Sequence, residues 1–394
     1  MPVLAELNQV QRNRILMRPV PISAGTPWTV PRRPPAQSTL ALVTTSGLHH
    51  RGDAPFLKYD QTHRVIDADV AEADLLQSQS SIGFDRSLRM RDVNVVFPAD
   101  RLRELVAEGA VGALTSHFYS LVGAQEDSEK TAETVGGRIG PLLLEQGAEA
   151  VLITPTCPVC THTSGVLARV LEEQGLATVA ISLVREYTEK VKPPRAVFVP
   201  FPFGAPCGLP GERAQQLSVV RTALATLTAP RGPVLVDFAS SGNGGYSPGP
   251  VQASGTPRSG RTELDAAAET SMMRRYHEQW VAEHGKTAVG LTRIPVVRFR
   301  GIIRFLESFA EGDADMRERP EDVPLPDFVR YCCDDLKALY LEGRLVMNPA
   351  ESADDAARWL WGETALGALL VGLKARMEAS DDPAVRDAAF GVAR

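Results

Sequence analysis

The stretch Ala150-Val-Leu-Ile-Thr154-Pro-Thr-Cys157-Pro-Val-Cys160-Thr-His162 decides how the first half of this 394-residue chain folds. Its first five residues are apolar or β-branched, which predicts a short buried strand, and helical periodicity runs from Thr163 to Gln174. The two cysteines therefore lie at a strand-to-helix turn. Unpaired amides and the positive end of the helix dipole favour an anion there, so we expect the pKa of a thiol at this turn to fall below the free value of about 8.5.

Strand-like runs alternate with helical periodicity on both sides of this turn. The sequence predicts strands at residues 39–45, 94–98, 150–154, 178–183, 196–200 and 233–238, and helices at residues 99–108, 131–146, 163–174 and 211–226. Alternation of this kind is typical of βαβ units with a mostly parallel sheet that helices cover on both faces. We therefore expect an α/β fold, a mostly parallel three-layer sandwich (Rossmann-like), in which ligands bind beyond the carboxyl ends of the strands.

The chain divides by composition into four parts. Residues 1–38 form an extended arm rich in Pro and Arg, which either lies over a neighbouring domain or partner subunit or is a disordered tail. Residues 39–240 carry the α/β pattern, and residues 241–261 are a linker rich in Gly and Pro. Residues 262–394 are expected to form an additional C-terminal helical domain.

Sequence patterns in the C-terminal part predict a helical bundle. Thr262 with Asp265, and Ser352 with Asp355, have the spacing of N-terminal capping boxes. Cys332 and Cys333 are adjacent, so we expect one to point into the core and the other towards the flank of its helix. Apolar side chains recur at helical spacing in two sets, Phe328, Cys332, Leu336 and Leu339, and Trp359, Leu366, Leu370 and Leu373.

Composition and charge exclude several classes of protein. Hydrophobic residues make up 44% of the chain and charged residues 23%, as in globular proteins. A net charge of −6 argues against nucleic acid as a partner, because nucleic-acid binders concentrate Lys and Arg. No apolar run approaches the length of about 20 residues that a membrane helix needs, and the N-terminus lacks a secretory pattern. Five cysteines are an odd number for an extracellular disulfide framework, so we expect a cytoplasmic protein.

A Cys-x-x-Cys pair at the start of a helix suits thiol redox chemistry. We expect Cys157, nearer the strand end, to be the attacking sulfur and Cys160 to resolve the mixed species. His162 either supplies a proton or lies in solvent beside the turn, and Cys207 is either a third thiol or a residue of a Pro/Gly loop. A zinc site would need two further ligands, and a pair without chemistry is the other alternative. We predict neither a metal site nor a bound cofactor.

Other polar residues lie near predicted strand ends. His49 and His50 follow the first strand, where they bind a carboxylate, act as an acid, or have no role. Asp53 either orients a histidine or an ammonium group or completes a turn. His117 and Tyr119 follow a strand predicted around residues 112–116, as functional residues or as a packed aromatic pair at the start of the next helix. All five are candidates for substrate binding or acid/base roles.

Further motifs occur in one order along residues 39–230. They are Gly47-Leu48-His49, Gly52-Asp53-Ala-Pro55-Phe56, Phe84-Asp85, the segments 92–102 and 108–112, His117-Phe-Tyr119 with Gly123, and Val199-Pro-Phe-Pro202-Phe-Gly204. With the cysteine pair, they resemble the selenoprotein B-type subunits of the glycine, sarcosine and betaine reductases and the related subunit of D-proline reductase. The resemblance implies that Cys157 stands at the family's selenocysteine position and Cys160 at that of its first cysteine, while Thr163 replaces the second. Nothing after Arg261 resembles the family.

The resemblance implies a reductase subunit that cleaves a carbon–heteroatom bond, expected to be a C–N bond, of a small amine or amino-acid-derived substrate. In the family, a pyruvoyl group on a partner subunit holds the amine, the chalcogen attacks the α-carbon, and thiols release the adduct. A pyruvoyl-type partner subunit, a homo- or hetero-oligomer and an external thiol or thioredoxin-like reductant are therefore expected here. Two alternatives remain, namely a thiol-disulfide oxidoreductase or sulfur carrier, and a zinc-binding assembly subunit that is not catalytic.

Overall fold

The computed structural model of the chain describes residues 17, 25–79, 81, 86–239, 265–311, 319–389 and 391–393. These residues form two compact units. The first contains residues 25–49, 59–71 and 86–239, and the second contains residues 50–58, 72–79 and 81 with the described residues from 265 onward. The predicted linker 241–261 and the Phe84-Asp85 motif lie outside the described residues.

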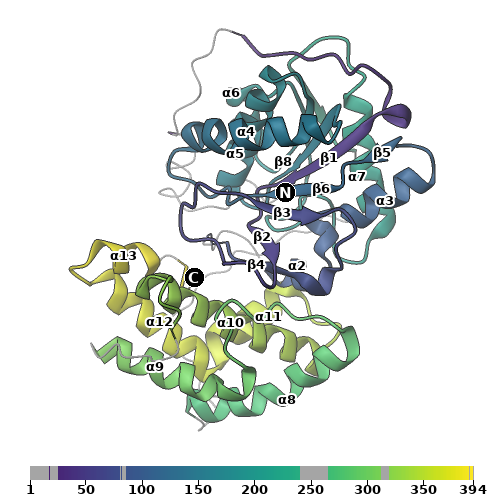
Figure 1. Cartoon of the computed structure of the whole chain (residues 1–394). Helices are drawn as coiled ribbons and strands as arrows, with labels where there is room; N and C mark the ends of the chain where they lie inside the picture. The colour runs from purple at the N-terminus through teal and green to yellow at the C-terminus, as the bar shows by residue number, and fades with distance from the viewer. Residues whose placement is uncertain are drawn as a thin grey trace. The chain divides into compact units, whose positions relative to one another are not determined.

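An eight-stranded sheet forms the centre of the first unit (Figure 1). Its strands are β1 (Thr39–Thr44), β3 (Arg64–Asp67), β5 (Ala113–Leu114), β6 (His117–Ser120), β7 (Ala150–Thr154), β8 (Ala177–Ser182), β9 (Arg195–Phe198) and β10 (Val234–Asp237). Their order is β10-β9-β8-β7-β1-β6-β3, and β5 pairs with β1. Neighbouring strands pair in parallel, except that β3 runs antiparallel to β6.

Most of the predicted strands are present, and one is wrong. The strands predicted at 39–45, 150–154, 178–183, 196–200 and 233–238 correspond to β1, β7, β8, β9 and β10. At 94–98 the chain instead forms a short 3-10 helix, η4 (Val93–Val95), because the Asp92 side chain accepts a hydrogen bond from the Asn94 amide. The Asn94 side chain in turn bonds Asp100. Local side-chain capping here overrides a run of β-branched residues.

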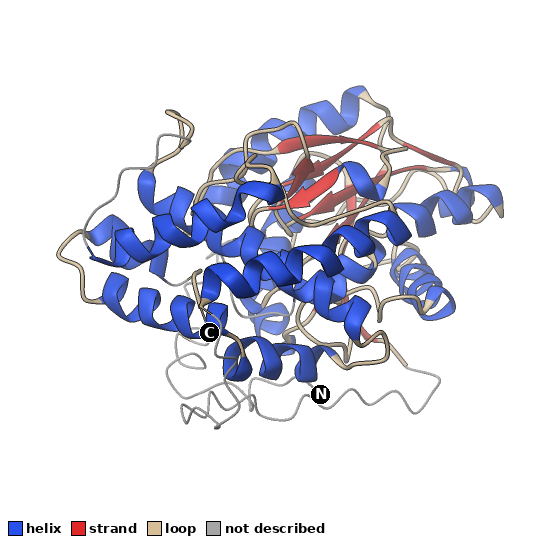
Figure 2. Cartoon of the chain, turned by 90° about the horizontal axis from the view of Figure 1, so that it is seen from below, coloured by secondary structure: helices blue, strands red, loops and turns tan. Residues whose placement is uncertain are grey.

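Helices cover both faces of this sheet (Figure 2). The helices of this unit are α2 (Arg86–Arg91), α3 (Ala99–Ala107), α4 (Ser128–Glu145), α5 (Pro158–Glu173), α6 (Arg185–Val191) and α7 (Arg213–Thr226). Val43 and Val151 belong to the apolar cluster under α4 and α5. Leu40, which points to the opposite face from its odd-numbered neighbours on β1, lies with Leu224 of α7. The first unit is therefore an α/β fold with a mostly parallel sheet.

Residues 25–38 pack on this unit around a buried ion pair. Arg195 Nη1 lies 2.8 Å from Glu172 Oε1, and both side chains are buried. The Trp28 ring lies 3.6 Å from the Arg195 guanidinium. The Thr29 amide donates to Glu172 Oε1 at 2.6 Å, and the Thr29 carbonyl accepts from Arg195 Nη2 at 2.8 Å. Residues 25–38 of the predicted arm are therefore packed on the α/β unit as part of its fold. Residues 1–16 and 18–24 lie outside the described residues.

The second unit is mainly helical. It contains α8 (Ala266–His284), η5 (Val296–Arg298), α9 (Phe299–Glu311), α10 (Leu325–Met347), α11 (Ala353–Glu363), α12 (Ala365–Glu378) and α13 (Pro383–Ala389), with η3 (Glu72–Asp74) and β4 (Leu75–Gln77), which pairs with β2 (Leu48–His50). The prediction that one of Cys332 and Cys333 lies at a helix flank is wrong, since neither is exposed. The reason is that α8, α9, α11 and α13 all contact α10. The predicted core residues Phe328, Leu336, Leu339, Leu366, Leu370 and Leu373 are buried, whereas Trp359 is only partly buried.

One of the two predicted capping boxes is present. The Ser352 hydroxyl accepts the Asp355 amide at the start of α11. Thr262, the first residue of the other predicted box, lies outside the described residues. Asp265 is itself the N-cap of α8, so its predicted role as the carboxylate partner of Thr262 is wrong. No helix in the described part of the chain has both the length and the apolar character that crossing a bilayer requires.

Candidate functional site

The two cysteines lie where β7 ends and α5 begins. Cys157 is the N-cap of α5, and its Sγ accepts a hydrogen bond from the Cys160 amide at 3.2 Å. Pro158 occupies the first turn, where its fixed φ suits a helix and its missing N–H costs no bond. Because Cys157 and Pro158 together start the helix, α5 begins at Pro158 rather than at the predicted Thr163. Both the amide and the helix N-terminus favour negative charge on the Cys157 sulfur.

The pair is oxidised and buried. A disulfide joins Cys157 and Cys160, whose Cα atoms are 5.0 Å apart. Neither side chain is exposed. Ala124, Val159 and Phe203 pack against the two sulfurs. The two sulfurs are therefore closed off from solvent by these groups.

The pair also lies at the topological switch point of the sheet. β1 lies between β6 and β7, so the chain turns to one side of β1 and then continues on its other side. The carboxyl ends of β1 and β7 are adjacent, because Thr44 is in register with Thr154 and the Thr45 amide donates to the Thr154 carbonyl at 2.9 Å. In open α/β sheets, ligands bind at this position.

The loop after β6 fixes the first turns of α5. The Thr163 hydroxyl lies 2.8 Å from both the Gly123 carbonyl and Ser128 Oγ. A Cβ atom at Gly123 would come within 2.7 Å of Thr45 Cβ and 3.0 Å of Cys160 Cα, so no side chain fits there. Thr163, at the position where the resemblance expects a further cysteine, therefore has a structural role in holding the helix.

Comparison with known proteins gives the family. Residues 26–156 match the family model described as glycine/sarcosine/betaine reductase selenoprotein B (GRDB). The D-proline reductase subunit gamma of Acetoanaerobium sticklandii is 32% identical over 209 residues, which cover 53% of this chain and 86% of that relative. The chain belongs to this selenoprotein B family. No solved structure matches the chain.

Other members of the selenoprotein B family are longer than the match. The glycine reductase complex component B subunit gamma of Carboxydothermus hydrogenoformans is 29% identical over 202 residues, which cover 49% of this chain and 46% of that relative. The sarcosine reductase complex component B subunit beta of Peptoclostridium acidaminophilum is 26% identical, with 48% of this chain and 44% of the relative covered. The chain thus spans about half the length of these two relatives. Because the relatives are reductase complex subunits, a reductase-related role follows for this chain.

His162 does not lie in solvent, which was one of its two predicted placements. Its side chain is buried in the first turns of α5, only 3% exposed. Its ring packs edge-on against Tyr187, with the ring centroids 5.2 Å apart. His162 therefore belongs to the packing between α5 and α6, two residues beyond Cys160.

His117 and Tyr119 lie on a strand of the sheet and not at the start of a helix, so that alternative is wrong. His117 is half-exposed at the beginning of β6, with Nε2 3.5 Å from Asp67 Oδ1. The Tyr119 hydroxyl accepts a hydrogen bond from Gln146 at 2.7 Å, and burial raises its pKa. Its ring contacts His63, with centroids 5.6 Å apart. These contacts involve β3 and the end of α4, so the structure does not bring the pair to the cysteines.

The remaining candidates, His49, His50 and Asp53, lie in β2 and in the turn that follows it. His49 is buried within β2. His50 and Asp53 belong to the second unit, where the His50 amide donates to Asp53 Oδ2 at 3.2 Å and the Asp53 amide donates to the His50 carbonyl at 3.0 Å. Asp53 thus closes a turn, which was one of its two predicted roles.

Cys207, the predicted third thiol, is buried, and no metal-binding cluster occurs among the described residues. Over the described ranges, no three His, Cys, Asp or Glu side chains gather in a way that could hold a metal ion. Cys207 is buried, and burial raises its pKa far above the usual range, with the Asp92 charge adding to the effect. Its amide bonds the Val95 carbonyl, which ties it to η4.

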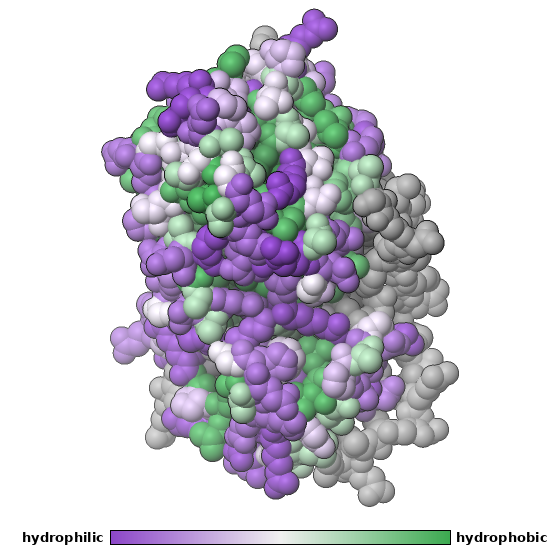
Figure 3. All heavy atoms as spheres, turned by 90° about the vertical axis from the view of Figure 1, so that its right-hand side faces the viewer, coloured by the Kyte–Doolittle hydropathy of each residue, from purple (hydrophilic) through white to green (hydrophobic). Residues whose placement is uncertain are grey.

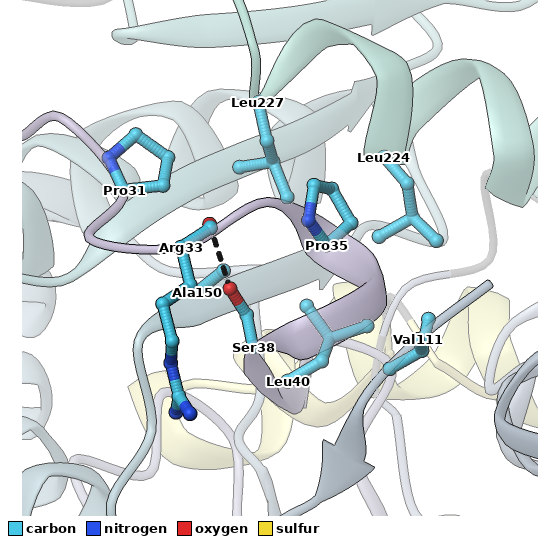
Figure 4. Close-up of a pocket in the computed structure, with 9 residues that line it drawn as sticks. All are labelled: Pro31, Arg33, Pro35, Ser38, Leu40, Val111, Ala150, Leu224 and Leu227. Atoms are coloured by element: carbon cyan, nitrogen blue, oxygen red, sulfur yellow. Dashed lines mark hydrogen bonds between the residues drawn. The ribbon is translucent and has the colours of Figure 1, made fainter. Parts of the chain in front are cut away.

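The pocket in Figure 4 lies near the amino ends of the central strands β1 and β7. It is lined by Pro31, Arg33, Pro35, Ser38, Leu40, Val111, Ala150, Leu224 and Leu227. Ala150 is the first residue of β7, whereas Cys157 follows its last residue. This pocket therefore has no part in chemistry at the cysteines. Phe203, which does cover them, lies in the Val199 to Gly204 motif, where only the family resemblance pointed to a role.

Proposed function

We propose that this chain is the thiol-bearing subunit of a cytoplasmic reductase, with Cys157 as the nucleophile and Cys160 as the resolving thiol. The observation that carries the proposal is the placement of the pair at the end of β7, with the Cys160 amide directed at the Cys157 sulfur and the two sulfurs within bonding distance. Membership of the selenoprotein B family supports the reaction class. We also propose that the α/β unit is a three-layer, Rossmann-like sandwich.

The proposed reaction cleaves a carbon–heteroatom bond, expected to be the C–N bond of a small amine or amino-acid-derived substrate. The Cys157 thiolate attacks the carbon, a C–S bond forms, and the nitrogen leaves with the electron pair of the C–N bond and takes up a proton. The Cys160 thiolate then attacks the Cys157 sulfur. The disulfide forms, and the carbon leaves with the C–S electron pair and takes up a proton. The substrate gains two electrons, and the dithiol becomes the disulfide of the structure.

Two further components belong to the proposal. An external thiol or a thioredoxin-like protein returns the disulfide to the dithiol. A partner subunit with a pyruvoyl-type carbonyl would supply the activation of the substrate carbon. Relatives named as gamma and beta subunits of reductase complexes support a hetero-oligomer.

Two serine variants test the roles of the cysteines. The complex is purified from the native host and divided into two samples. One sample is assayed for reductive release of amine, and the other is treated with borohydride in the presence of substrate to trap a Schiff base. We expect Cys157→Ser to lower turnover by more than about 10³-fold, as loss of a nucleophile does. Cys160→Ser should complete only the first step, so that intact mass shows an adduct on Cys157.

The control is Cys207→Ala, which changes a thiol outside the pair and should keep turnover near that of the unaltered chain. A Cys157→Ser complex with full activity would end the proposal. Reduction of a simple disulfide by the chain without any partner would instead favour a general thiol-disulfide oxidoreductase or sulfur carrier. One zinc ion per reduced chain would favour the assembly subunit.

A further inference from the structure

Two short segments from the first half of the sequence belong to the helical unit. Residues 50–58 and 72–79 group with the helices that follow residue 265. Both segments lie inside residues 26–156, which match the selenoprotein B family model, and those helices lie outside the match. The two segments, which match the family model, are therefore covered by helices that lie outside the match.

Arg51 joins the two segments to the helical unit. Its Nη1 donates to the Val289 carbonyl at 2.7 Å and its Nη2 to the Thr287 carbonyl at 2.5 Å. Its guanidinium also bonds the Ala73 carbonyl at 3.3 Å in the second segment. Because this one side chain donates to three carbonyls in two separate parts of the chain, its loss would leave these carbonyls without that donor.

Apolar side chains of both segments are buried in the same unit. Phe56 is not exposed, its amide donates to Ser78 Oγ at 2.7 Å, and its carbonyl accepts from Arg330 and from the Tyr331 hydroxyl, both at 3.0 Å. Leu76 is 1% exposed. Without the helices, these apolar side chains would form an exposed patch. Exposed apolar patches are typical of protein–protein interfaces.

The D-proline reductase gamma subunit has too little chain to cover this patch in the same way. The match covers 86% of that relative but only 53% of this chain. The part of that relative outside the match is much shorter than the segment of residues 265–393 in this chain. In that relative, the surface that corresponds to residues 50–58 and 72–79 can therefore be buried only by another polypeptide.

We infer that residues 265–393 are an in-chain partner, which binds a surface, residues 50–58 and 72–79, that the short relative buries against a different subunit. This goes beyond the proposed function, because it concerns assembly and holds whatever bond is cleaved. In this chain, a contact that is elsewhere made between subunits has become a contact within one polypeptide.

Cutting the chain tests the inference. A protease site is inserted within residues 241–261 and the purified protein is cleaved. Residues 50–58 and 72–79 then belong to one fragment and the helices to the other, so the fragments should elute together on size exclusion. The double variant Arg51→Ala, Phe56→Ala should raise the dissociation constant of the fragments at least tenfold. Leu57→Ala, in the same segment but 36% exposed, is the matched control and should leave it unchanged.

A second measurement addresses the relative. A photo-crosslinking residue at the Phe56 counterpart of the D-proline reductase gamma subunit, within its intact complex, should attach to a different chain. The inference is overturned if the cut fragments of this chain separate as two folded species, or if the relative gives no product that joins two chains.

Discussion

At the scale of single residues, the five cysteines differ in what surrounds them. Cys157 and Cys160 have an amide donor and a helix N-terminus, whereas the other three are buried away from such groups. Burial raises the pKa of Cys333 to about 12, and burial also raises the pKa of Cys207 and of Cys332 well above the usual range. Below these pKa values each thiol stays protonated, so its thiolate is scarce at neutral pH.

This difference predicts selective alkylation. After reduction, iodoacetamide at pH 8 should modify Cys157 or Cys160 at least about 100-fold faster than Cys207, Cys332 and Cys333, because the thiolate is the reactive species. Peptide mass spectrometry of timed samples measures each rate, and a urea-unfolded sample, in which all five react alike, is the control. Fast labelling of Cys333 in the folded protein would contradict the buried environment described above.

At the scale of elements, the ion pair of Arg195 and Glu172 joins β9, α5 and the segment of residues 25–38. Replacing Arg195 by Met leaves the Glu172 carboxylate buried with a charge that nothing neutralises. We expect Arg195→Met to lower the free energy of unfolding by about 3 to 5 kcal/mol, as other broken buried pairs do. Urea unfolding followed by circular dichroism measures it.

The control is an ion pair that is partly exposed. Arg33 pairs with Glu149 at 2.5 Å, with half of its side chain in solvent. Arg33→Ala should therefore cost at most about 1 kcal/mol. Equal losses for the two variants would show that burial does not set the strength of these pairs.

Sequence patterns predict some of these elements and not others. Strands β1 and β7 to β10 were predictable because buried parallel strands are short apolar runs between turn residues. The start of α5 was not, because a cysteine is an unusual N-cap, and η4 depends on side-chain bonds of Asp92 and Asn94 that periodicity does not record. The position of Cys157 after a strand was predictable for the same reason as β7. The burial of His162 and the cover by Phe203 depend on contacts between distant segments.

At the scale of the whole molecule, each unit includes stretches that are far apart in sequence. Asp335 is fully buried and accepts hydrogen bonds from the amides of Gly290, Leu291 and Thr292 at 2.8 to 2.9 Å. These residues continue directly from the loop whose carbonyls bind Arg51. A substitution at Asp335 should therefore also destabilise residues 50–58, which come from the first half of the sequence.

We expect Asp335→Asn to lower the free energy of unfolding by about 3 kcal/mol, because an amide cannot accept all of these bonds. Hydrogen exchange should increase in residues 287–292 and 50–58 but not in β7 and α5. Asp381→Asn, at an exposed position, is the control and should change exchange in neither place. Increased exchange spread evenly over both units would contradict this prediction.

Gly123 has a consequence for reading other sequences. Any side chain at this position would collide with Thr45 and with the backbone of Cys160, so an altered residue there implies a displaced helix start. In a survey of uncharacterised genes, a Cys-x-x-Cys motif alone is a weak diagnostic, because it is short and recurs by chance. A glycine 34 positions before the first cysteine, in addition to the motif, indicates that the loop after β6 can pack against the start of α5 as it does here. Position 123 therefore separates homologues that can keep this cysteine-bearing helix start from those that cannot.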